Sequence, residues 1–445
     1  MNSGKNGPLS WRDGLRYGLL GMPLAFVALP LYVVLPNHYA REFGVPLATL
    51  GWLLLGARLF DAFIDPLIGR ASDRLFARST AAVLAVGGLA AVALALGFTG
   101  LFFPAWREPD RLLAWAAAML MLTYLAYSTL SVSHQAWGAL LGGDEAGRSR
   151  IVAWREGLGL VGVVAASVLP VTAGLPATTG VFYVLLSMGW LAWRQAPRPV
   201  ATASGPRLMT PQATNRLQGE PPRVPHPLRD AAFRRLLAVF MLNGIASAVP
   251  ATLVLFFVQD RLQAPAALEP AFLGLYFVCA AAAIPLWLRL VTRMGLARTW
   301  LCGMALSIAV FVWAAQLGAG QSTAFLVVCA LSGVALGTDL ALPGAMLAGL
   351  LSSHREAAGS AAAGRYFGWW NFATKLNLAL AAGLALPLLA VFGYRPGSRD
   401  PAALDALGFA YGLLPCLLKA AAAACLYLLV IRPRNTSFLQ PEPHP

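Results

Sequence analysis

Three charged residues, Arg58, Asp61 and Asp65, lie inside one apolar stretch that runs from about residue 47 to residue 68. The stretch is long enough to cross a bilayer as a single helix, where each charge costs about 2.5–3.5 kcal/mol on insertion scales. Because Asp61 and Asp65 are four residues apart, their side chains fall on one helical face. Two carboxylates there can give hard oxygen ligands to Na⁺ or share a proton. We interpret them as a cation or proton site; the alternative is a buried structural group in which Arg58 neutralises one carboxylate.

These residues belong to a longer motif, Arg58-Leu-Phe-Asp61-Ala-Phe-Ile-Asp65-Pro66-Leu-Ile-Gly69-Arg-Ala-Ser-Asp73-Arg74. The motif resembles the second-helix signature of the glycoside–pentoside–hexuronide:cation symporters, a branch of the major facilitator superfamily that includes the melibiose carrier and lysophospholipid symporters. The resemblance implies that Asp61 and Asp65 carry the coupling cation. Its last part resembles the major facilitator loop motif, which implies a gating role for Asp73 and Arg74 in which Asp73 caps and ion-pairs with neighbouring helix ends.

Composition and hydropathy predict the element that carries the motif and the others around it. The 445 residues are 58% hydrophobic and only 12% charged, as in a polytopic membrane protein. We expect an all-α membrane protein of twelve spans, at about 15–36, 47–69, 80–103, 112–138, 151–173, 177–195, 233–258, 270–291, 298–318, 322–351, 361–392 and 405–431.

A proline-rich segment, 196–230, separates the sixth span from the seventh and is predicted to be a mobile cytoplasmic linker. It divides the chain into an N-terminal six-helix bundle at 1–195 and a C-terminal one at 231–445, as in the major facilitator fold. The formal charge of +14 comes mostly from Lys and Arg on the side of the termini. This positive-inside bias indicates cytoplasmic termini rather than a nucleic-acid partner. The default expectation is a monomer in a bacterial inner membrane.

Lys375 lies in the middle of the span 361–392, where a buried ammonium needs a counter-ion. Related symporters carry a lysine in this context, so the resemblance implies that Lys375 pairs with Asp61 or Asp65. Together with Arg58 it would couple cation binding to conformation. The alternative is a snorkelling lysine, although the span continues for about 15 residues on either side.

Polar and aromatic residues in other spans are candidates for the substrate cavity. His134 is either a substrate or relay residue or a packing histidine, and Arg155 either holds substrate or closes a gate with Asp144 or Glu145. Asp339 is either a substrate or proton site or part of an interhelical hydrogen bond, and aromatic residues of the eleventh span either line the cavity or pack. The full set is Ser131, His134, Arg155, Asp339, Tyr366, Trp369, Trp370 and Asn371.

Other signals are weaker. Lys419 is expected to snorkel or pack, and the five cysteines are expected to be packing residues. No phosphate loop, metal cluster or catalytic triad pattern is present, so we expect no enzyme and no cofactor beyond the coupling Na⁺ or H⁺.

We expect a secondary transporter that moves a small solute by alternating access, with cation binding coupled to conformation. Residues 17–36 contain no carboxylate, and Ser131 stands where sugar-transporting relatives carry an Asp. Both features favour an anionic or amphipathic solute over a galactoside. The alternatives are a lysophospholipid or lipid carrier of the same family, and a non-transporting membrane sensor or assembly factor.

Overall fold

The computed structural model describes residues 10–199, 226–358, 362–394 and 397–432, and within these ranges the chain is helical with no β-strand. Contacts divide the chain into two compact units. Unit 1 comprises Met1–Ala231 and Leu347–Phe372, and unit 2 comprises Ala232–Met346 and Ala373–Pro445. The predicted bundle boundaries stay a prediction, and most of the predicted linker, residues 200–225, lies outside the described residues.

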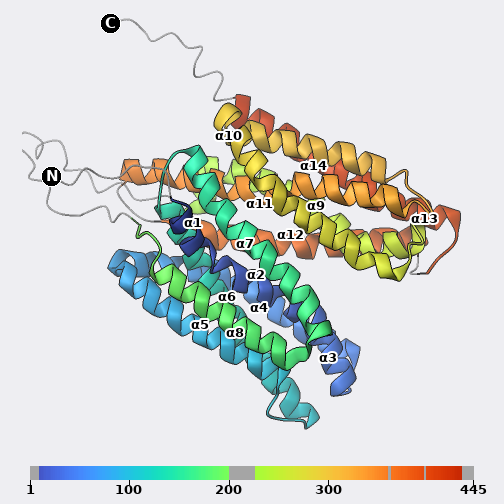
Figure 1. Cartoon of the computed structure of the whole chain (residues 1–445), viewed down its shortest axis with the longest axis horizontal. Helices are drawn as coiled ribbons and strands as arrows, with labels where there is room; N and C mark the ends of the chain where they lie inside the picture. The colour runs from blue at the N-terminus through green and yellow to red at the C-terminus, as the bar shows by residue number, and fades with distance from the viewer. Residues whose placement is uncertain (1–9, 200–225, 359–361, 395–396, 433–445) are drawn as a thin grey trace, which may run out of the picture. The chain divides into compact units, whose positions relative to one another are not determined.

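The first half of the chain supplies eight helices to unit 1 (Figure 1). They are α1 (Trp11–Gly18), α2 (Gly21–Leu29), α3 (Leu35–Glu42), α4 (Leu47–Arg78), α5 (Thr80–Phe102), α6 (Pro109–Leu140), α7 (Glu145–Thr172) and α8 (Gly174–Arg194). A π-helical turn, Pro30–Val34, joins α2 to α3, so α1 to α3 form one span. Side-chain oxygens of Ser10, Ser79 and Asp144 cap the first turns of α1, α5 and α7, because the N–H groups there have no partner within the helix.

Apolar packing in unit 1 brings α5 against α6, α2 against α7 and α4 against α6. An aromatic group joins α2, α5 and α8, with the Phe182 ring 5.9 Å from Phe26 and 4.6 Å from Phe98. These rings are fully buried. The contact between α4 and α6 joins the helix of the motif carboxylates to the helix of the polar residues of the fourth predicted span.

The remaining helices are α9 (Ala231–Phe256), α10 (Glu269–Ala314), α11 (Ser322–Ala358), α12 (Ala363–Val391), α13 (Pro401–Gly408) and α14 (Leu414–Leu426). Short turns of 3₁₀ or π-helix lie at Pro227–Arg229, Phe257–Arg261, Ala266–Leu268, Phe409–Leu413 and Tyr427–Ile431. α10 is two arms that meet at Gly295, whose φ of 79° and ψ of 170° are not helical. The two arms correspond to the eighth and ninth predicted spans. The helices α11 and α12 pass from one unit to the other.

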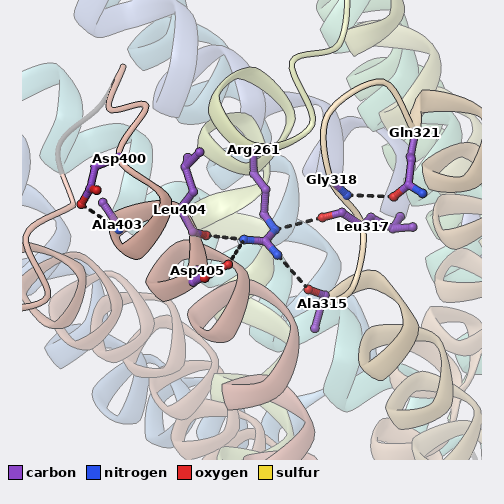
Figure 2. Close-up of polar contacts among 9 residues, drawn as sticks. All are labelled: Arg261, Ala315, Leu317, Gly318, Gln321, Asp400, Ala403, Leu404 and Asp405. Carbon is purple, nitrogen blue, oxygen red and sulfur yellow. Dashed lines mark hydrogen bonds and ion pairs between the residues drawn. The ribbon is translucent and has the colours of Figure 1, made fainter.

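Arg261 ties three segments together at the end of the π-turn that follows α9 (Figure 2). Its Nε donates to the Leu317 carbonyl at 2.9 Å, and its Nη1 donates to the Leu404 carbonyl at 2.6 Å and to Asp405 at 3.1 Å. The neighbouring Asp260 accepts hydrogen bonds from the Tyr394 hydroxyl and, at 2.9 Å, from the Gly397 N–H. Burial and the Asp260 carboxylate raise the pKa of Tyr394 above its ordinary value. Together, these residues fix the start of α13 and the turn before it within unit 2.

The helix inventory agrees with a membrane protein of twelve spans. Eight of the described helices are long and apolar enough to cross a membrane. Counting α1 to α3 as one span, the arms of α10 separately and α13 with α14 as one, the helices follow the predicted order of twelve. The helix α4 is not among the eight, since it carries the charged motif.

Candidate functional site

The helix α4 turns two carboxylates inward and an apolar stripe outward. Asp61 is 3% exposed and Asp65 is fully buried, as their spacing on one helical face predicts. The exposed side of the same helix carries Trp52, Leu59, Phe63 and Leu67. In a bilayer this arrangement keeps the carboxylates away from lipid, as polar groups in a span require. Arg58, the third charge of the motif, is exposed.

Ser128 on α6 is a partner of Asp61 that the sequence did not single out. Its Oγ donates to Asp61 Oδ1 at 2.9 Å, and both side chains are buried. The packing of α4 on α6 explains how residues 67 positions apart meet. The sequence named Ser131 and His134 of the same span as cavity candidates but indicated no pairing with Asp61. Asp61, Asp65 and Ser128 thus supply hard oxygens of the kind that bind Na⁺ or a proton.

The start of α12 crosses α4 next to these carboxylates, within unit 1. A Cβ on Gly368 would lie 2.5 Å from the carbonyl oxygen of Asp65, and a Cβ on Gly364 would lie 2.4 Å from that of Gly69. Such distances are too short for any side chain, so glycine is required at both α12 positions. Small residues four apart allow helix backbones to approach this closely. The backbone of Asp65 is therefore in direct contact with α12.

Asp73, which lies on α4 beyond Asp65 and Gly69, contacts the first turn of α12. It accepts hydrogen bonds from the Gly364 N–H at 2.7 Å, from the Arg365 N–H at 3.1 Å and from Arg365 Nε at 2.9 Å. These bonds satisfy N–H groups that the helix start leaves without partners. Asp73 lies beyond the predicted span 47–69, and burial raises its pKa to about 6 although the bonds from Arg365 oppose the shift. Arg74, the second residue predicted to gate, is exposed.

Candidate cavity residues of the first half pack inside unit 1. His134 is fully buried, stacks on the Tyr17 ring at 4.3 Å and shares a hydrogen bond of 2.8 Å with the Tyr17 carbonyl oxygen. This is the environment of a packing histidine, one of its two predicted roles. Ser131 accepts a hydrogen bond of 2.8 Å from Gln135. Arg155 forms an ion pair with Glu156.

The alternative for Arg155 was a gate with the acidic turn before α7. Asp144 instead caps that helix by accepting from the Gly147 N–H at 2.7 Å. A gate between Arg155 and that turn stays a prediction.

The aromatic candidates lie at the start of α12, in the part that belongs to unit 1. The Tyr366 hydroxyl donates to Asp230 at 3.0 Å, and both residues are buried. The Trp369 ring lies 5.6 Å from Phe372. Trp370 is 6% exposed, whereas Asn371 is half-buried. Tyr366 therefore takes part in packing, while the contribution of the others to a cavity stays a prediction.

Two further candidates lie in unit 2. Lys375 belongs to unit 2 while Asp61 and Asp65 belong to unit 1, and their pairing stays a prediction. Asp339 forms an ion pair of 2.8 Å with Lys419, which is 4% exposed. Of the two expected roles of Lys419, snorkelling or packing, the structure favours packing, because the Asp339 carboxylate on α11 holds its ammonium inside the protein. The position of Lys419 within the predicted span 405–431 is the sequence signal for such a counter-ion.

No group of three or more His, Cys, Asp or Glu side chains suited to a metal occurs among the described residues. All five cysteines are free thiols. The oxygen-rich site on α4 and α6 is thus the clearest candidate for a bound ion in the described part of unit 1.

A chain whose described residues are helical, follow the predicted order of twelve spans and bury carboxylates between helices has the architecture of a polytopic membrane transporter. The sequence profile of the MFS/sugar transport protein family matches residues 16–432. The chain belongs to this family of the major facilitator superfamily, as the resemblance of the 58–74 motif indicated. It is a transporter and not an enzyme.

Solved structures show the same fold at low sequence identity. A bacterial homologue of the iron transporter ferroportin in an outward-facing state is 17% identical, with a TM-score of 0.65 over 94% of this chain and 100% of that one. The human organic anion transporter MFSD10 (TETRAN) is 18% identical, with a TM-score of 0.62 over 92% of this chain and 99% of that one. The E. coli fucose:proton symporter FucP is 16% identical, with a TM-score of 0.61 over 93% and 97%. The search of curated proteins gave no significant match.

Proposed function

We propose that this transporter is a cation-coupled symporter in which Na⁺ or H⁺ binds at Asp61 and Asp65 and drives the movement of a small solute. The observation that carries the proposal is the burial of both carboxylates on one face of α4, with Ser128 donating to Asp61. Buried carboxylates cost free energy unless a cation, a proton or hydrogen bonds compensate their charge. A coupling ion that enters this site supplies that compensation.

The crossing of α4 and α12 supports a route from ion binding to conformation. The helix α4 carries both the proposed ion ligands and Asp73. Three of its residues, Asp65, Gly69 and Asp73, contact the start of α12. A cation that draws Asp61 and Asp65 together would shift α4 against Gly368 and Gly364. We propose that the Asp73 contact closes one side of the transporter and that ion and solute binding together set when it opens.

The solute that we propose is anionic or amphipathic. The fold itself selects no solute, because the neighbours named above are a homologue of an iron transporter, an organic anion transporter and a fucose:proton symporter. Within this chain, α2 and the π-turn after it contain no carboxylate that could hold sugar hydroxyls. The apolar α2 and the aromatic start of α12 also suit a lysophospholipid or another lipid. Sodium-dependent melibiose uptake by the purified protein in liposomes would contradict this assignment.

A thermal-unfolding titration of the purified chain with NaCl, at constant ionic strength made up with choline chloride, tests the ion site. Saturating a site that only the folded state offers stabilises the protein by about 2.7 kcal/mol at 100 times the dissociation constant. We expect Na⁺ to raise Tm in the wild type and to have no effect on Asp65→Asn. The matched control is Asp110→Asn, which changes an exposed carboxylate at the start of α6 and should respond like the wild type.

The same titration separates the two coupling ions. A Tm that does not respond to Na⁺ or Li⁺ indicates a proton as the coupling ion. In that case we expect the pH dependence of Tm to differ between the wild type and Asp65→Asn. If Asp65→Asn matches the wild type in both its Na⁺ response and its pH dependence, the carboxylates are structural and the proposal is wrong.

A further inference from the structure

Unit 2 contains a buried ammonium that is enclosed by oxygen atoms. Lys419 on α14 donates to Asp339 Oδ2 on α11 at 2.8 Å, to Asn243 Oδ1 on α9 at 3.0 Å and to Ser247 Oγ on α9 at 3.2 Å. Asn243 and Ser247 are four residues apart, so they face Lys419 from one side of α9. We call Asn243, Ser247 and Asp339 the oxygen cage.

The hydrogen bonds of this group are complete. An ammonium has three N–H donors, and each donor of Lys419 has one cage oxygen within 3.2 Å. The other carboxylate oxygen of Asp339 accepts from Trp300 Nε1 at 2.8 Å, and Oδ2 also accepts from Ser247 at 3.2 Å. Lys419 is only 4% exposed and Asn243 only 3%, the Asp339 side chain is 13% exposed, and the formal charges of Lys419 and Asp339 cancel.

The oxygen cage has the composition of a site for a monovalent cation. It combines one carboxylate with an amide oxygen and a hydroxyl oxygen, so one positive charge neutralises it and a divalent ion would leave an excess buried charge. The lysine ammonium is a compact point charge on a flexible stem, and its size is close to that of K⁺. Nearby, Asn377 is 3% exposed and packs on the backbone of Gly244, and its Oδ1 has no hydrogen-bond donor among the described residues.

We propose that Lys419 is a tethered cation, and that the oxygen cage is a monovalent-cation site which its ammonium occupies permanently. The charge of the Asp339 carboxylate in unit 2 is then balanced at every stage of the transport cycle without an ion from solution. The oxygen cage of the wild type should therefore not respond to Na⁺ or K⁺ in solution. The proposal does not depend on the assignment of Asp61 and Asp65.

The test removes the tether and supplies a free cation in its place. The full-length chain with Asp61→Asn and Asp65→Asn serves as the parent, so that the proposed site on α4 is silent. Lys419→Ala in this parent empties the position of the ammonium. Thermal unfolding is then measured with KCl, NaCl or LiCl against choline chloride at constant ionic strength. We expect a saturable rise of Tm with K⁺ or Na⁺ in Lys419→Ala and none in the parent.

Two matched variants show where the ion binds. Adding Asp339→Asn to Lys419→Ala removes the negative charge of the oxygen cage and should abolish the salt response. Lys419→Met fills the vacated space with an uncharged side chain and should also lack the response. A salt response that survives Asp339→Asn would place the ion elsewhere and overturn the proposal.

Folding of the variant is itself a result. If Lys419→Ala is recovered folded only in K⁺ or Na⁺ and aggregates in choline chloride, a free cation has replaced the ammonium, as expected. If Lys419→Ala folds but shows no response to any of the three ions, the oxygen cage does not bind free cations. If it fails to fold in every salt while Lys419→Met with Asp339→Asn folds, a free cation cannot substitute. Failure of both variants in every salt counts against the proposal in the same way.

Discussion

At the scale of single residues, two charged side chains in the described spans of this transporter meet partners from different helices. Ser128 on α6 donates to Asp61 on α4, and Lys419 on α14 pairs with Asp339 on α11. Without such partners, a charged side chain in a span costs several kcal/mol. The two cases differ in chemistry, because Ser128 is a neutral hydroxyl donor whereas Lys419 is an ammonium that forms an ion pair with its carboxylate.

Ser128→Ala is expected to weaken the Na⁺ response of Tm. The substitution removes a donor and an oxygen ligand beside Asp61, and a hydrogen bond to a charged group is worth about 1.5–3 kcal/mol. This corresponds to a roughly 10- to 100-fold rise in the Na⁺ concentration at half-maximal stabilisation. Ser128→Thr keeps the hydroxyl and should stay near the wild type. An unchanged midpoint in Ser128→Ala would remove Ser128 from the proposed site.

Asp73 should make stability depend on pH. Its pKa rises from an ordinary 3.8 to about 6 in the folded protein, mainly through burial, so the folded state binds more protons than the unfolded state between these values. Its contribution to stability is therefore full below 3.8 and is lost as the pH rises through about 6. We expect the Tm of the wild type, relative to Asp73→Asn, to fall across this interval by the equivalent of roughly 2 kcal/mol. A constant difference between the two proteins would contradict the shift.

At the scale of elements, the crossing of α4 and α12 depends on glycine. The carbonyl oxygens of Asp65 and Gly69 lie where Cβ atoms of residues 368 and 364 would be, and backbone atoms cannot rotate away as side chains do. Because Asp73 caps the start of the same helix, the two elements are held both by polar contacts at one end and by close backbone packing along their length.

Gly368→Ala should force α4 and α12 apart. Overpacking of this kind costs about 1–3 kcal/mol, and here it would favour the conformation in which the crossing is open. The readout is maleimide labelling of a Ser72→Cys reporter, followed by peptide mass spectrometry, since Ser72 is buried beside Gly364. We expect faster labelling in Gly368→Ala. Gly180→Ala on α8, where a Cβ meets nothing within 4 Å, is the control and should label like the parent.

At the scale of the whole molecule, the segment 347–372 links the two parts of the chain. This segment lies in the second half of the sequence but belongs to unit 1. Asp73 accepts hydrogen bonds from Gly364 and Arg365, and Arg148 donates one to Ser352. An ion that binds on α4 can therefore influence α12, which continues into unit 2. This continuity is the structural basis of the coupling that we propose.

Hydrogen exchange measured by mass spectrometry should detect that coupling. We expect Na⁺ to change the exchange rate of the amides in 363–372, because these residues contact α4 beside the proposed ion ligands. Asp65→Asn should remove the change. If Na⁺ alters exchange only within α4, ion binding does not reach α12 and the proposed route is wrong.

The sequence by itself determined the class of protein, the positions of the spans and the charged motif on α4. These follow from local properties, since span length, hydropathy and the spacing of Asp61 and Asp65 are set by neighbouring residues. For His134 the sequence left two roles open, because the ring can pack or bind, and only its contact with Tyr17, 117 residues away, favours packing.

The tertiary structure alone decided which residues meet. Ser128 reaches Asp61 across 67 positions, Lys419 reaches Asp339 across 80, and Asp73 reaches Gly364 across 291. Each pair depends on which helices pack together and on their rotation, and many partners satisfy the same local pattern. The pairing of a buried charge is a property of helix packing, so a sequence that places Asp61 or Lys419 in a span predicts that a partner exists but not which residue it is.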